Sequence, residues 1–129
     1  MALLSPVTFT AHIIGGAARG RQIGSPTLNA DLSDVPQALG EGIYACFISM
    51  DEQTERFPAV MHYGPRPVFA DSLTCEIHVL DRQILSPPTL LTIDVVAYIR
   101  SVSNFPSTEA LQAQIQSDIK AARGILNLP

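Results

Sequence analysis

The sequence contains no tryptophan and only two cysteines, Cys46 and Cys75. Both cysteines lie in apolar, strand-like stretches and lack the spacing of metal ligands. This placement favours buried free thiols in a reducing compartment over a disulfide, although two cysteines still leave a disulfide possible. A zinc-stabilised or disulfide-rich fold is therefore not expected.

Charge is also scarce. Charged residues make up 16% of the 129 positions, and the formal net charge is −4. An acidic balance of this size gives no bulk attraction for nucleic acid. No apolar run approaches the ~20 residues of a membrane span, and the N-terminus has no signal-peptide pattern. We therefore expect a cytoplasmic protein with neither nucleic acid nor membrane as a partner.

Hydrophobic residues make up 47% of the chain, enough for one substantial core, and we expect residues 1–129 to form a single domain and a monomer. Short β-rich runs separated by Gly, Pro and polar turns predict strands, and a surface loop is expected at 31–40, either a connector or a lid. The predicted strands are 7–14, 26–30, 42–50, 56–63, 73–80 and 89–99.

The periodicity changes near the C-terminus. Leu111, Ile115, Ile119, Ala122 and Leu126 recur at three- and four-residue steps, which predicts a helix over 107–126 with one apolar face. Several short strands followed by one helix indicate a mostly-β protein, a closed or nearly closed antiparallel barrel with the helix packed outside.

A glycine-rich run, residues 15–24, precedes Pro26. Glycines allow successive backbone N–H groups to surround an anion, and Arg19 and Arg21 add positive charge. Beyond Pro26 the chain is extended, so Thr27 and Asn29 point to the same side. Their oxygens suit a magnesium ion that already carries phosphate oxygens. The alternative is a tight turn leading into a strand.

The stretch from Gly20 to Asn29, GRQIGSPTLN, resembles the G-R-x-L-G-x-P-T-A-N signature of the riboflavin kinase (flavokinase) family. Weaker matches follow this stretch in the family's order. Together with it, the landmarks of the resemblance span from about Ile14 to Leu128. They are GIY at 42–44, PAV at 58–60, GPRP at 64–67, CEIHVLD at 75–81, YIR at 98–100, NF at 104–105 and IQSDI at 115–119.

The resemblance implies a six-stranded Greek-key barrel and transfer of the γ-phosphate of Mg²⁺–ATP to riboflavin, giving FMN. It places the catalytic glutamate, which would deprotonate the ribityl 5′-hydroxyl, at Glu76. Taken with the glycine-rich loop, it implies that nucleotide is bound by Gly15, Gly20, Arg21, Thr27 and Asn29. Thr27 and Asn29 would also bind the metal, and Arg100 and Phe105 the flavin.

The chain departs from the family pattern in two loops. Leu85-Ser86-Pro87-Pro88 replaces a Leu-Tyr-Gly turn, and Arg100-Ser101-Val102-Ser103 lacks the lysine of an Arg-Pro-Glu-Lys stretch. The sequence contains no nucleotidyltransferase half, so dinucleotide synthesis is not predicted. Two alternatives remain open. One is a non-catalytic flavin- or nucleotide-binding barrel module, and the other is an interaction domain that uses loop 31–40.

Overall fold

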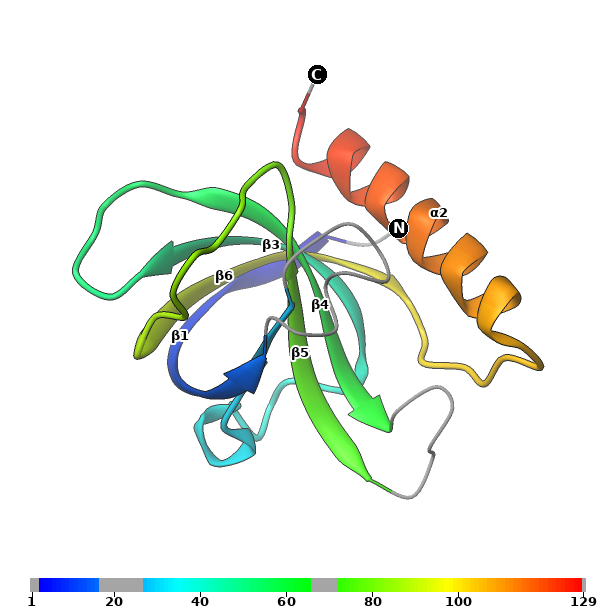
Figure 1. Ribbon diagram of the computed structural model, residues 1–129, viewed down its shortest axis with the longest axis horizontal. Helices are drawn as coiled ribbons and strands as arrows, with labels where there is room; N and C mark the ends of the chain where they lie inside the picture. Colours follow the sequence, from blue (N-terminus) through cyan, green and yellow to red (C-terminus); the bar gives the residue numbers. More distant parts are fainter. Residues whose placement is uncertain (1–2, 17–26, 66–71, 129) are drawn as a thin grey trace.

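The computed structural model describes residues 3–16, 27–65 and 72–128. Six antiparallel strands close into a barrel, and one long helix lies along its outside (Figure 1). The strands are β1 (Leu3–Gly16), β2 (Thr27–Ala30), β3 (Gly42–Met50), β4 (Phe57–Pro65), β5 (Leu73–Val79) and β6 (Leu90–Arg100), and α2 spans Thr108–Ile125. This confirms the predicted fold. Strand β1 begins four residues earlier and ends two residues later than predicted.

The strand order around the barrel is β1-β2-β5-β4-β3-β6. The connections from β2 to β3 and from β5 to β6 therefore join strands that are not neighbours, as in a Greek key. Because side chains alternate along each strand, one set fills the barrel and the other faces outward. The inner set includes Phe9, Leu28, Met61, Ile77 and Ile93, all at most 8% exposed.

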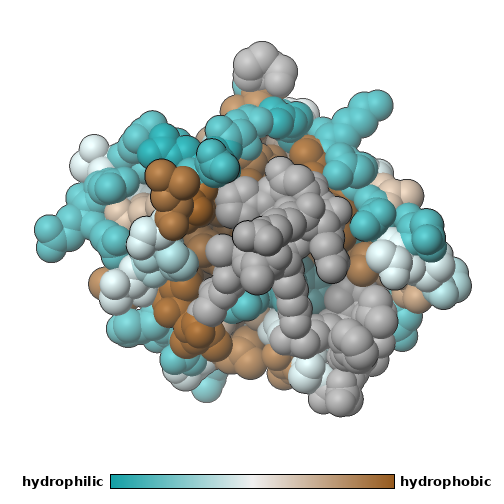
Figure 2. All heavy atoms as spheres, viewed as in Figure 1, coloured by the Kyte–Doolittle hydropathy of each residue, from teal (hydrophilic) through white to brown (hydrophobic). Residues whose placement is uncertain are grey.

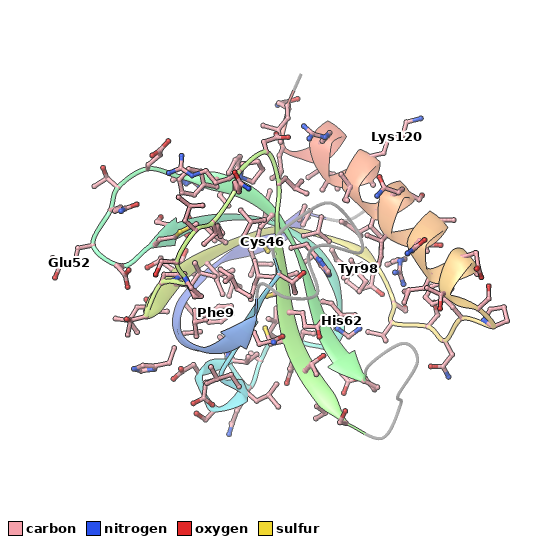
Figure 3. The ribbon with its side chains drawn as sticks, viewed as in Figure 1. Phe9, Cys46, Glu52, His62, Tyr98 and Lys120 are labelled. Carbon is pink, nitrogen blue, oxygen red and sulfur yellow. The ribbon has the colours of Figure 1, made fainter. Side chains whose placement is uncertain are left out.

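The outer face of β3, β4 and β6 is covered by α2. Ile43, Ala45 and Val60 pack with Ala122 and Leu126 in a second apolar cluster. The Ser107 side chain caps the helix by accepting a hydrogen bond from the Ala110 N–H. Lys120 lies on the opposite face of the helix, pointing away from the barrel (Figure 3). The predicted apolar stripe therefore packs against strands.

The surface distribution agrees with this packing. Figure 2 shows hydrophilic side chains over the outer side of α2 and around the β3–β4 turn. Glu52 is at the tip of that turn (Figure 3). Among the described residues, no helix is both long and apolar enough to cross a membrane.

The loop at 31–40 is partly structured. The loop contains a 3-10 helix, η1 (Leu32–Asp34). Asp31 caps its N-terminus, where the Asp31 side chain accepts a hydrogen bond from the Ser33 N–H. Val35 and Leu39 are buried in the barrel core, and Asp34 accepts hydrogen bonds from both the backbone and the ring of His12. The loop is therefore packed against one end of the barrel.

The two cysteines are free and buried, as predicted. Burial raises the pKa of the Cys75 thiol to about 12 and raises that of Cys46 further. Because only the thiolate reacts quickly, we expect a disulfide reagent at pH 8 to leave both thiols unmodified in the native protein. In guanidinium chloride it should titrate both, and fast reaction of either native thiol would contradict the burial described here.

Candidate functional site

One row of cross-strand neighbours runs across the outside of the barrel through all six strands. Pairing joins Arg100 to Ile43, Ile43 to His62, His62 to Glu76, Glu76 to Asn29 and Asn29 to Gly15. We call these six residues the outer row. Neighbours in such a row lie about 5 Å apart and face the same side of the sheet. The row therefore brings together four residues predicted separately from the sequence: Arg100, Glu76, Asn29 and Gly15.

The outward direction of the row follows from the alternation of buried residues. Leu28, Met61 and Ile77 flank Asn29, His62 and Glu76 in sequence, and all three are fully buried in the barrel core. The pattern exists because β2, β4 and β5 each carry apolar side chains at every second position. A one-residue slip in register would move the polar set into the core and the apolar set to the outside.

Thr27 and Asn29 lie on β2 and point to the same side, as predicted. Thr27 pairs with His78 of β5, and its hydroxyl is 3.1 Å from His78 Nδ1. Thr27 is only 1% exposed, so this hydrogen bond fixes the hydroxyl in a buried setting. Burial lowers the pKa of His78, which keeps the imidazole neutral.

The amide of Asn29 has an unusual environment. Within the described part of the chain, Asn29 Oδ1 is buried and has no hydrogen-bond partner. A buried amide oxygen without a partner loses free energy of about 1–3 kcal/mol relative to a satisfied one, so such atoms often mark ligand sites. Amide and hydroxyl oxygens are the neutral ligands that Mg²⁺ accepts beside phosphate. Thr27 and Asn29 therefore fit the predicted metal site.

The described residues, 3–16, 27–65 and 72–128, contain no cluster of three or more His, Cys, Asp or Glu side chains that could hold a metal ion. The predicted nucleotide residues Gly20 and Arg21 lie outside the described residues. Gly15 is described, and its backbone pairs with Asn29 at the end of β1.

Arg100 and Phe105 are close together, with the guanidinium carbon 5.7 Å from the ring centre. Arg100 also forms a two-point ion pair with Asp118 of α2: Nε–Oδ1 and Nη2–Oδ2 are each 2.8 Å. Gln114 donates a further bond of 3.0 Å to Asp118 Oδ1. Asp118 was not among the predicted site residues, because only the fold places this helix residue beside the end of β6.

His62 is another residue whose position could not be inferred from the sequence. It occupies the outer row between Ile43 and Glu76 and is 7% exposed. Asp81, two residues after the end of β5, has a left-handed backbone with φ 60°. Its carboxylate accepts hydrogen bonds from Arg123 of α2, which lowers its pKa.

Comparisons with known proteins show which family the chain resembles. The sequence model of the family described as "Flavokinase: Riboflavin kinase" matches residues 3–126. A bifunctional riboflavin kinase/FMN adenylyltransferase of Pseudomonas fluorescens is 30% identical over 93% of this chain, which spans only 38% of that protein. A riboflavin kinase of Yarrowia lipolytica is 28% identical over 91% of this chain and 79% of its own length.

A solved structure resembles the fold over nearly the whole chain. It is the crystal structure of riboflavin kinase from Trypanosoma brucei, with a TM-score of 0.64 and 25% sequence identity. The similarity covers 98% of this chain and 83% of that one.

Proposed function

Because the chain belongs to the riboflavin kinase (flavokinase) family, we propose that it transfers the γ-phosphate of Mg²⁺–ATP to the ribityl 5′-hydroxyl of riboflavin, giving FMN. The outer row is the observation that carries this proposal. Asn29, the carboxylate of Glu76 and the guanidinium of Arg100 lie in this one row. We assign Asn29 to the phosphate side of the site. Phosphoryl transfer requires mainly this kind of positioning and charge stabilisation.

The nucleotide side of the site is assigned to β1, β2 and the connection between them. Gly15, Gly20 and Arg21 would bind phosphates, while Thr27 and Asn29 would hold the magnesium ion of Mg²⁺–ATP. Asn29 Oδ1, which is buried without a hydrogen-bond partner among the described residues, supports this assignment. A bound magnesium ion neutralises charge on the transferring phosphate.

Glu76 is assigned the role of general base. It is the direct cross-strand neighbour of Asn29, so an alcohol beside its carboxylate would lie next to the phosphate side. The hydroxyl oxygen forms a bond to the γ-phosphorus while the bond from that phosphorus to the β–γ bridging oxygen breaks. The hydroxyl proton passes to the Glu76 carboxylate, and ADP leaves.

Arg100 and Phe105 are assigned to the flavin ring. A guanidinium group and an aromatic ring about 6 Å apart suit a flat heterocycle. Asp118 would hold the Arg100 guanidinium in place. We further propose that residues 1–129 act as one monomeric domain in the cytoplasm. The two buried free thiols support the reducing compartment.

The direct test is a chromatographic assay of FMN formation from riboflavin, with nucleotide and metal varied. We expect FMN to appear with ATP and magnesium and to disappear when the metal is chelated. Flavin binding without product under every nucleotide and metal would instead identify a non-catalytic binding module.

Substituting Thr27 tests the metal assignment. Thr27→Val keeps the shape of the side chain but removes the hydroxyl, which also leaves His78 Nδ1 without its partner. We expect kcat/KM for Mg²⁺–ATP to fall by about 10- to 100-fold, with riboflavin affinity unchanged. Thr27→Ser is the matched control and should stay within a few-fold of the native enzyme. Equal activity of the two variants would remove Thr27 from the site.

A further inference from the structure

His62 is a buried histidine whose ring has no hydrogen-bond partner in the part of the chain that the structure describes. It is 7% exposed, yet among the described residues neither Nδ1 nor Nε2 makes a hydrogen bond. Leaving both polar atoms of a buried ring unsatisfied is unfavourable, by about 1–3 kcal/mol for each. Native proteins seldom retain such a group without a function or a missing partner.

Two features of the fold lie close to His62 along β4. His62 is two residues from Val60, which packs under α2, and two from Gly64. The segment after β6 approaches so closely at Gly64 that a Cβ there would lie 2.9 Å from Val102 Cγ2, and Gly64 has φ +146°. Figure 3 shows His62 on β4. His62 is 7% exposed and lies in the outer row.

The charge state of the ring is set by burial. Desolvation lowers the pKa of His62, and nearby Glu76 partly opposes this effect, while Arg100 adds to it. The carbonyl groups of His62 and Pro65 also raise the pKa, but neither meets the geometry of a hydrogen bond. A neutral imidazole offers one donor and one acceptor. Hydroxyl groups, which both donate and accept, match that pair.

The position of His62 in the outer row indicates which hydroxyl groups its ring would bind. On one side, across Ile43, lies Arg100, assigned to the flavin ring, and on the other side lies Glu76, assigned to the reacting hydroxyl. In riboflavin a polyhydroxylated chain joins these two parts. Ile43 is buried in the cluster under α2, so of the two residues between Arg100 and Glu76 it is His62, the direct neighbour of Glu76, that offers polar atoms to the polyol.

We propose that His62 is a specificity-determining residue whose neutral imidazole hydrogen-bonds the ribityl hydroxyls of the acceptor. This inference rests on the proposed function, since it uses the roles of Arg100 and Glu76. The inference adds a residue that recognises the polyol chain. Through it the protein would distinguish riboflavin from a flavin that has the ring but no polyol.

The test compares two ligands by quenching of flavin fluorescence: riboflavin, and lumiflavin, which has the ring without the polyol. We expect His62→Phe to weaken riboflavin binding by about tenfold, the effect of about 1.4 kcal/mol, and to leave lumiflavin binding unchanged. His62→Asn restores a donor and an acceptor and should recover part of the loss. His12→Gln, at an exposed histidine on β1, is the matched control.

A second measurement uses the native protein, so that it does not depend on the folding of a variant. The chain has three histidines, and ¹⁵N labelling of their rings gives a small, assignable spectrum. We expect the His62 ring nitrogens to shift on addition of riboflavin and not on addition of lumiflavin.

The outcomes separate the two proposals. Equal losses for both ligands in His62→Phe, or no His62 shift with riboflavin, would overturn the role of His62 while FMN formation by the native protein continued. If the native protein neither binds riboflavin nor forms FMN, the proposed function fails and the role of His62 fails with it.

Discussion

Replacing Glu76 with glutamine is expected to lower kcat for FMN formation by about 10²- to 10⁴-fold. The amide keeps the size of the side chain but cannot accept the proton of the ribityl 5′-hydroxyl. Affinity for riboflavin and Mg²⁺–ATP should change by no more than a few-fold, because the phosphate and flavin residues are untouched. The measurements are steady-state kinetics by chromatography and riboflavin binding by fluorescence.

Glu55→Gln is the matched control for this substitution. Glu55 lies in the exposed turn before β4 and forms a surface ion pair with Arg82, with N–O at 3.7 Å. Its replacement should leave kcat within experimental error. A Glu76→Gln enzyme that retains more than about a tenth of native kcat would exclude the carboxylate as general base.

Removing the carboxylate of Asp118 should give the largest loss of stability. Asp118 is 4% exposed, and it receives two bonds from Arg100 and one from Gln114. In Asp118→Ala the Arg100 guanidinium loses its partner in a largely buried place. We expect the free energy of unfolding to fall by about 3 kcal/mol, measured by denaturant titration with circular dichroism.

Two further variants identify the cause of that loss. Asp94→Ala removes an exposed ion pair with Arg56 and an exposed hydrogen bond from Thr8, and it should destabilise the protein by about 1 kcal/mol. The double substitution Arg100→Leu with Asp118→Leu removes both charges and should be less destabilised than Asp118→Ala. If Asp118→Ala is no less stable than Asp94→Ala, the buried pair is not a major stabilising contact.

Much of the architecture could be predicted because it depends on local rules. A short β-rich run predicted β5, and apolar residues at three- and four-residue steps predicted α2. The helix was predicted to begin at 107, and Ser107 is the residue that caps α2. β1 was predicted too short at both ends because Leu3–Pro6 and the two glycines after Ile14 give weak strand signals.

The site could be predicted only in part. The motif around Pro26 singled out Thr27 and Asn29 because an extended strand places alternate residues on one side. Asp118 and His62 were missed as functional residues for a common reason. Nothing near either residue in the sequence shows that an arginine 18 positions earlier, or a glutamate 14 positions later, will be its neighbour.

By itself, the sequence determined which residues alternate, where helix α2 begins, and which side chains carry oxygen or charge, since each depends on residues only a few positions apart. The tertiary structure alone decided the outer row. Strand order and register select one residue from each of six strands, and closing the barrel brings them together across as many as 85 positions of the chain. The register is set because the apolar faces of all six strands must be buried in one core. No single strand can meet that condition alone.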